Sequence, residues 1–447
     1  MKKLNLFVVL LISVVFFFTI VACTPSPDPA PGGGGAAEEA ETPAETPAED
    51  PAPVVANDDI VVVAWEMYGP QRNMDGLVAE FNAIDNGIYV DQEFLPGHAE
   101  LIQRLMVVAA AESDIPDAVL VDMFYAPFID ELVGNVDLRP FIDADPTLDY
   151  YDFYVSLREF SVVDGRQISI HAYANNLILY YNRAHFIEAG LDPYSPPRSW
   201  DDLVTYAQAL TGDGQIGFHS HGFEATYYEG LSWVFQTFLW QNGGEVWDSN
   251  WQATFNSPQG IGALQFMVDL VHHYQVATTA PPAEGFQQGL ISMFKEGTWM
   301  AQAFREALGD DLMAAPLPYN VTPATNIGGE HWQIIQSTPE QEAAMWEYIS
   351  FMLSEHAVME IISNGGQVPT RRSISEGEAF LSFIADCPGT TASMQSMEFG
   401  RMRATSSRYA AASEAKFHYL ERAMFAVISV EEALAGAEVA WQNAIND

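Results

Sequence analysis

Aromatic residues next to polar ones follow two predicted strands, where side chains could bind a small polar ligand. Trp65 and Tyr68 follow the first predicted strand, and Phe124 and Tyr125 follow the third. Open parallel sheets bind ligands at the carboxyl ends of their strands. An aromatic face can stack on the C–H face of a sugar ring, while carboxylates and amides bind its hydroxyls. A single aromatic is more often a core residue, but the two clusters together favour a binding site.

Residues with catalytic potential lack the context that catalytic motifs require. Gly212, Gly214 and Gly217 match G-x-G-x-x-G, but they follow a predicted helix at 203–210, whereas nucleotide-binding glycines follow a strand. We interpret them as a helix stop and a turn. With 60 acidic residues some carboxylates must lie close together, so composition predicts no glycosidase-like pair. We predict no catalytic residue and no cofactor.

Two histidine pairs could begin a metal site. His219 and His221 would share one face of a strand, and His272 and His273 lie near a predicted helix end. A structural zinc site needs four ligands, so we interpret both pairs as structural and predict no metal site.

Strands and helices alternate along the folded part of the chain. The unbroken apolar run at 60–64 is typical of a strand buried on both faces. The alternation predicts an α/β fold with a parallel sheet. Ser199, Ser257 and Thr338 are predicted helix N-caps. Further strands are predicted at 88–94, 118–121 and 177–181, helices at 74–84 and 101–109, and a buried helix at 343–353.

The N-terminus, residues 1–22, has two lysines followed by a long apolar run, which indicates an export signal. The run is also long enough for an uncleaved membrane anchor. Ala22-Cys23 at its end resembles the bacterial lipobox, although Ile20 and Val21 replace the usual residues, and we expect a lipid on Cys23. Cys387 would then be unpaired, and we interpret it as a structural thiol rather than a metal ligand or nucleophile.

Residues 23–56 are mostly Pro, Gly, Ala and Glu, which predicts a disordered tether, so folding should start near Asn57. The formal net charge is −42. Such a field repels nucleic acid and anionic lipid, so we expect no nucleic-acid partner and membrane contact only through the lipid. The acidity would suit a high-salt habitat or simply keep the protein soluble.

Short segments between residues 60 and 370 resemble those of one known family. They are Pro116–Val119, Leu179–Asn182 with Phe186 and Gly190, Pro197–Leu203, Phe255–Pro258, Phe286 to Trp299, Gly328–Gly329, and Gly365–Pro369. In this order and spacing they resemble the family-1 extracellular solute-binding proteins of ABC importers, which include maltodextrin- and multiple-sugar-binding proteins.

The resemblance implies a two-lobed periplasmic-binding-protein-like fold, with a hinge and a central ligand cleft. The first lobe would comprise 57–170 plus about 328–366, and the second 171–327 plus about 367–447. The chain should cross between the lobes near 171–175, 325–328 and 366–369.

Carried over position by position, the resemblance also implies a set of ligand-binding residues. Sugar binders of the family often have Asp, Arg or Lys at the positions of Phe124 and Tyr125. The resemblance therefore does not decide which sugar binds, or whether the ligand is a sugar at all. The expected residues are Trp65, Tyr68, Phe124, Tyr125, Asn175, Trp233, Trp299, Glu330, Trp332 and Arg371.

The function that the resemblance implies is capture of a sugar or oligosaccharide, without catalysis, for the permease of an ABC importer. The protein would be a monomer, lipid-anchored at the outer face of the cell membrane or in the periplasm. Two alternatives stay open: the same fold with a peptide, polyamine or metal complex as its ligand, or an exported glycan hydrolase.

Overall fold

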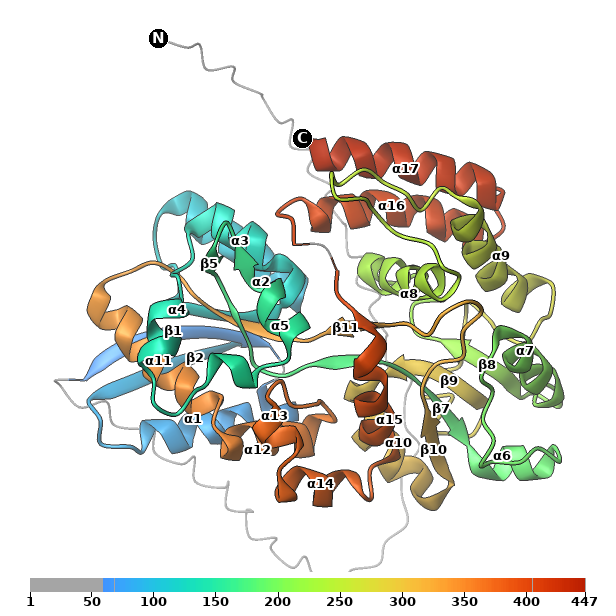
Figure 1. Cartoon of the computed structure of the whole chain (residues 1–447), viewed down its shortest axis with the longest axis horizontal. Coiled ribbons are helices and arrows are strands. Elements are labelled where there is room, and N and C mark those ends of the chain that lie inside the picture. Colours follow the sequence, from blue (N-terminus) through green and yellow to red (C-terminus); the bar gives the residue numbers. More distant parts are fainter. Residues whose placement is uncertain (1–58, 68, 404, 447) are drawn as a thin grey trace, which may run out of the picture. The chain divides into compact units, whose positions relative to one another are not determined.

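Two mixed β-sheets organise the residues that the computed structural model describes, which are 59–67, 69–403 and 405–446 (Figure 1). These residues fall within one compact unit, Val55–Asp447. The predicted signal segment and tether, including Cys23, lie outside the described residues.

The first sheet has the order β2-β1-β3-β12-β6 and, with the helices on it, forms what we call the first lobe. Strands β2 and β3 pair with β1 in parallel, as the alternating pattern predicts. Strand β12 is antiparallel to β3 and β6, so the expectation of a parallel sheet is wrong here. It returns from the second sheet instead of completing a βαβ crossover, the connection that parallel neighbours require. The strands are β1 (Ile60–Met67), β2 (Ile88–Leu95), β3 (Ala118–Asp122), β6 (Ile170–His171) and β12 (Glu330–Ile334).

The three helices predicted for the first lobe, at 74–84, 101–109 and 343–353, are present. The helix predicted at 343–353 is α11, whose Tyr348 and Ile349 are fully buried against the sheet. A small hairpin, β4 (Val162–Val163) and β5 (Arg166–Gln167), extends the lobe. The helices are α1 (Met74–Asn82), α2 (His98–Ala111), α3 (Ala126–Val133), α4 (Arg139–Ala144), α5 (Val155–Phe160), α11 (Pro339–Met352) and α12 (Glu355–Gly365).

The second sheet has the order β13-β11-β7-β9-β8, with β10 also paired to β7, and centres the second lobe. Strand β7 is buried along its whole length and is antiparallel to β9, β10 and β11. The strands are β7 (Asn175–Asn182), β8 (Ile216–Ser220), β9 (Ile291–Gly297), β10 (Leu312–Ala315), β11 (Thr325–Gly328) and β13 (Gly400–Arg401).

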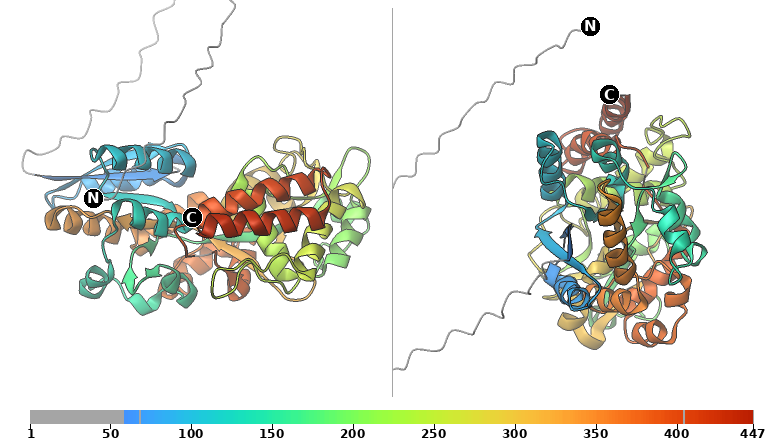
Figure 2. Two further views of the ribbon diagram at one scale, coloured as in Figure 1. Left: turned by 90° about the horizontal axis from the view of Figure 1, so that it is seen from above. Right: turned by 90° about the vertical axis from the view of Figure 1, so that its left-hand side faces the viewer.

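Helices surround the second sheet, and the two lobes lie side by side in Figures 1 and 2. The C-terminal helices α16 and α17 pack on each other and on α8 and α9. The predicted N-caps at Ser199, Ser257 and Thr338 are confirmed, the first as a full capping box with Asp202. The helices are α6 (Arg183–Glu188), α7 (Trp200–Ala209), α8 (Tyr228–Gln241), α9 (Pro258–His272), α10 (Ala301–Leu308), α15 (Pro388–Ser396), α16 (Tyr409–Met424) and α17 (Val430–Asn446), while α13 (Arg372–Ser375) and α14 (Glu378–Ile384) link α12 to α15.

Three connecting segments lie side by side between the lobes: 172–174 joins β6 to β7, Gly329 joins β11 to β12, and 366–368 follows α12. Ala174 and Val368 exchange two backbone hydrogen bonds of 3.0 and 2.9 Å. Gly329 has φ +142°, and a Cβ there would lie 2.2 Å from the Tyr173 carbonyl oxygen, so only glycine fits.

Candidate functional site

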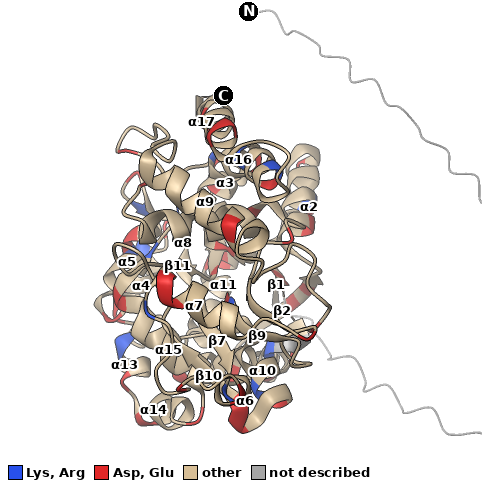
Figure 3. Cartoon of the chain, turned by 90° about the vertical axis from the view of Figure 1, so that its right-hand side faces the viewer, with Lys and Arg blue, Asp and Glu red and all other residues tan. Residues whose placement is uncertain are grey.

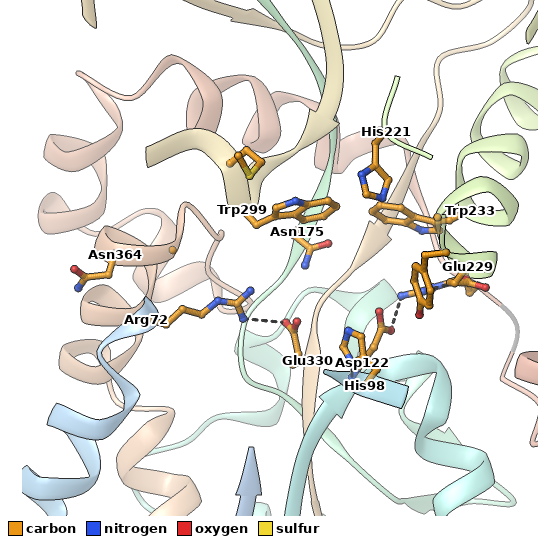
Figure 4. A pocket seen from close by; sticks show the side chains of 15 residues that line it. Arg72, His98, Asp122, Asn175, His221, Glu229, Trp233, Trp299, Glu330 and Asn364 are labelled. Atoms are coloured by element: carbon orange, nitrogen blue, oxygen red, sulfur yellow. Dashed lines mark hydrogen bonds and ion pairs between the residues drawn. The ribbon is translucent and has the colours of Figure 1, made fainter. Parts of the chain in front are cut away.

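A cavity of about 390 Å³ lies between the lobes and is lined by side chains from both of them (Figure 4). The first lobe contributes the segment after β1, the start of α2 and the end of β3. The second lobe contributes His221 after β8, helix α8 and the turn after β9. Asn175, Glu330 and Gly365, each next to a connecting segment, line the cavity as well. Its volume is at the lower end of the range of about 300–1,000 Å³ that is typical of small-molecule sites.

Two tryptophans form an aromatic wall in the second lobe. The rings of Trp233, on α8, and Trp299, after β9, are stacked with centroids 5.8 Å apart and planes inclined by 26°. His221 meets Trp299 edge-on at 5.6 Å. Gly297 makes room for this wall, because a Cβ there would lie 2.1 Å from the Trp299 ring.

A buried ion pair lines the opposite side. Arg72 Nη1, in the 3₁₀ turn Gly69–Arg72, lies 3.4 Å from Glu330 Oε2 at the start of β12. Burial raises the pKa of Glu330, and the charge of Arg72 opposes that rise. The Arg72 guanidinium also lies over the Tyr173 ring, 4.7 Å from its centroid.

A second buried cation holds two carboxylates. Arg403 Nη2 lies 2.5 Å from Asp122 Oδ1, and its Nη1 lies 3.2 Å from Glu229 Oε1. Burial disfavours the charge on Arg403, but the two carboxylates outweigh this effect and raise its pKa. Glu229 also accepts hydrogen bonds from Tyr409 and Ser413 at 2.8 and 2.5 Å, so its position is fixed.

The two cavity histidines differ in charge preference. Burial lowers the pKa of His98 to about 3, helped by the charge of Arg403, so this ring is neutral. Burial also disfavours the charge on His221, but Glu296, whose Oε1 is 3.2 Å from its Nδ1, raises the pKa above its usual value.

Four of the predicted ligand-binding residues line this cavity: Asn175, Trp233, Trp299 and Glu330. Tyr68 lies outside the described residues. The other five do not line it.

Trp65 lies inside β1, because the strand continues to Met67, beyond its predicted end at Ala64. Its ring packs under Arg104 of α2, with the guanidinium carbon 4.4 Å from the ring centroid. Trp332 lies within β12 and packs edge-on against Tyr348 of α11 at 5.5 Å. Both are core residues in this structure rather than cavity residues.

Phe124 and Tyr125 are covered by the second lobe. Phe124 packs against Tyr409 at 5.4 Å, and the Tyr125 hydroxyl lies 2.9 Å from that of Tyr228. Arg371 does not line the cavity, and its guanidinium donates a hydrogen bond of 2.5 Å to the Leu353 carbonyl.

The sequence interpretation missed most of the charged cavity residues. His221 was interpreted as structural, and no motif marks Arg72 or Arg403. Asp122 is the exception, because it ends β3 just before Phe124 and Tyr125, which were predicted to bind the ligand. The missed residues are Arg72, His98, Asp122, His221, Glu229 and Arg403.

The histidine pairs and Cys387 were the other candidates for metal binding or nucleophilic chemistry. Within the described residues, no group of three or more His, Cys, Asp or Glu side chains is arranged to hold a metal ion. Cys387 is buried, which raises the pKa of its thiol, and its Sγ accepts a hydrogen bond from Arg305 at 2.9 Å. None of the described helices is long and apolar enough to cross a membrane.

The chain is similar to known bacterial solute-binding proteins. Residues 76–384 match the family model described as bacterial extracellular solute-binding protein. A probable amino-acid ABC transporter periplasmic-binding protein of Sinorhizobium fredii is 24% identical over 260 residues, 52% of this chain and 56% of its own length. An arabinooligosaccharide-binding protein of Halalkalibacterium halodurans is 23% identical over 336 residues, 71% of this chain and 69% of its own length. The chain thus spans little more than half of the first relative.

A solved structure shares the fold over nearly its whole length. The cyclic α-maltosyl-1,6-maltose binding protein from Arthrobacter globiformis has a TM-score of 0.76 with this chain at 28% identity. The match covers 87% of this chain and 99% of that protein.

Proposed function

The chain belongs to the bacterial extracellular solute-binding protein family, and we propose that it captures a neutral, hydroxyl-rich solute, a sugar or short oligosaccharide, for an ABC importer. The solute would occupy the cavity between the lobes. It would bind there without chemical turnover and be released to the membrane permease.

The proposal that the solute is neutral rests on the pairing of charges in and beside the cavity. Arg72 faces Glu330, Arg403 faces Asp122 and Glu229, and His221 faces Glu296. An ionic solute would have to break one of these pairs, each of which has at least one buried member, and leave that charge uncompensated, which is costly. Hydroxyl groups can instead bind the remaining donor and acceptor positions without disturbing the pairs.

Among neutral solutes, the aromatic wall favours a sugar as the ligand. The faces of Trp233 and Trp299 suit the C–H face of a pyranose or furanose ring, and Asn175 supplies amide groups for its hydroxyls. The arabinooligosaccharide-binding relative and the cyclic-maltosyl-maltose-binding structure point to the same class of solute.

We further propose that residues 1–22 direct export and that Cys23 carries the lipid anchor. The acidic positions are distributed over many elements (Figure 3). Because like charges repel, this distribution would keep the folded part of a lipid-anchored monomer soluble and prevent its self-association.

Titration calorimetry of the purified protein tests the solute class. Maltose, maltotriose and arabinotriose form one panel, and glycerol 3-phosphate, glutamate and spermidine form the charged panel. We expect saturable binding of at least one sugar and none of the charged solutes. Binding of a charged solute, with no heat from any sugar, would overturn the proposal.

A further inference from the structure

Arg72 contacts two of the three connecting segments between the lobes, and Glu330, which directly follows the other one. Its Nη1 donates to the Tyr173 hydroxyl in the first segment and lies 3.4 Å from Glu330 Oε2, beside Gly329 in the second. With the Gln367 amide oriented so that both its ends are satisfied, its oxygen accepts from Arg72 Nη2 at 3.1 Å in the third segment.

The arginine is built into this position. It is 5% exposed, and its guanidinium lies over the Tyr173 ring. Gly365, at the end of α12, leaves space for its stem, because a Cβ there would lie 3.1 Å from Arg72 Cγ. A planar guanidinium presents donors in several directions at once, which the single ammonium of lysine cannot reproduce.

Backbone hydrogen bonds also link the three segments, the second of them through Glu330, which follows Gly329. The amide of Ala174 donates to Val368, that of Val368 donates back to Ala174, and that of Ala172 donates to the Glu330 carbonyl at 3.0 Å. The Gln367 side chain adds a hydrogen bond to the Ala174 carbonyl at 3.2 Å.

We propose that Arg72 is a positioning residue that fixes the three connecting segments in one arrangement and thereby sets how the two lobes face each other around the cavity. Arg72 also lines the cavity (Figure 4), so a bound solute that contacts its guanidinium acts on all three segments together. The inference goes beyond the proposed function, and it holds whatever the solute is.

Native-state hydrogen exchange of the solute-free full-length protein tests this role. In Arg72→Met, we expect exchange at the amides of Ala172, Ala174 and Val368 to rise together, by about tenfold or more. The β1–β2 ladder should keep its protection. Because no ligand is added, failure here is distinguishable from failure of the proposed solute.

Arg104→Met is the matched control. Arg104 is also a first-lobe arginine over an aromatic ring, Trp65, with a carboxylate partner, Glu93, but it contacts none of the three segments. Its substitution should leave the three amides unchanged. A rise at only one of them in Arg72→Met, no rise, or a uniform rise throughout the protein would overturn the proposal.

Tyr173→Phe provides a milder variant if Arg72→Met does not fold. It removes only the hydroxyl, which accepts from Arg72 and also hydrogen-bonds the Glu330 carboxylate. Exchange should again rise at all three amides, by a smaller factor. Faster exchange at the Ala174 amide alone would contradict the proposal that Arg72 holds the three segments together.

Discussion

Arg403, which is buried, and Asp122, which is partly exposed, form an ion pair of 2.5 Å across the two lobes. Asp122 ends β3 in the first sheet, whereas Arg403 lies between β13 and α16 in the second lobe, 281 residues later. The same guanidinium holds Glu229 of its own lobe. The pair therefore joins the two lobes directly.

Asp122→Asn should weaken the contact between the lobes. The variant keeps the shape of the side chain but removes the charge that faces Arg403, while Glu229 still compensates the guanidinium. We expect a loss of about 1–3 kcal/mol in the free energy of unfolding. Small-angle scattering should also show a larger radius of gyration for the solute-free protein.

Glu131→Gln is the control for Asp122→Asn. Glu131 of α3 also pairs across the lobes, with Arg408 at 3.2 Å, but both side chains are largely exposed. An exposed pair contributes at most about 1 kcal/mol, so this variant should behave like the wild type. Equal effects of the two substitutions would mean that the Asp122–Arg403 pair holds the lobes together no more strongly than the exposed pair does.

Trp299→Ala should weaken solute binding about ten- to a hundredfold, because it removes one face of the aromatic wall. Trp251→Ala is a matched control. Trp251 also packs against a second tryptophan of the second lobe, Trp247 at 5.8 Å, but it does not line the cavity. Titration calorimetry with the best-bound sugar measures the affinity of both variants. If Trp299→Ala binds the sugar as tightly as Trp251→Ala does, Trp299 does not contact the solute.

Local patterns in the sequence predicted the elements well. The capping box at Ser199 and the turn at 212–215 depend on neighbouring residues, and the structure contains both. The position of β12 beside β3 depends on a chain return of some two hundred residues, which no local pattern encodes. The antiparallel pairing was missed for that reason.

The site was predictable only in part, for a related reason. Glu330 lines the cavity because it begins β12, while Trp332, two residues on, is covered by α11. A family position identifies the strand but not the residue at which the strand leaves the sheet. The ion pairs join residues far apart in the sequence, so only the folded chain brings Arg403 to Asp122.

Cys23→Ser should abolish lipid attachment and release the protein from the membrane fraction. The prediction rests on Ala22-Cys23 at the end of the apolar run. Mass spectrometry of the mature N-terminus checks it: a diacylglyceryl-modified Cys23 is expected in the wild type. A retained Met1 or an unmodified Cys23 would contradict it. Cys387→Ser is the control, because that thiol is buried in the fold and should not affect anchoring.

Glu66→Gln should stabilise the protein at neutral pH. Burial raises the pKa of Glu66 from about 4.5 to about 8, while hydrogen bonds, chiefly from the Tyr348 hydroxyl at 2.8 Å, only partly oppose it. The folded state therefore keeps the proton that the unfolded state loses above pH 4.5. Stability from this group is complete below that pH and is lost progressively as the pH rises to about 8.

Glutamine is neutral at every pH, so it avoids this loss. The gain in unfolding free energy should be absent at pH 4, grow with pH, and reach about 2–4 kcal/mol at pH 8. Chemical denaturation at pH 4, 6 and 8 measures it. Glu347→Gln, on the exposed face of α11, should show no such trend. A gain for Glu66→Gln that is the same at all three pH values would mean that Glu66 does not hold its proton in the fold.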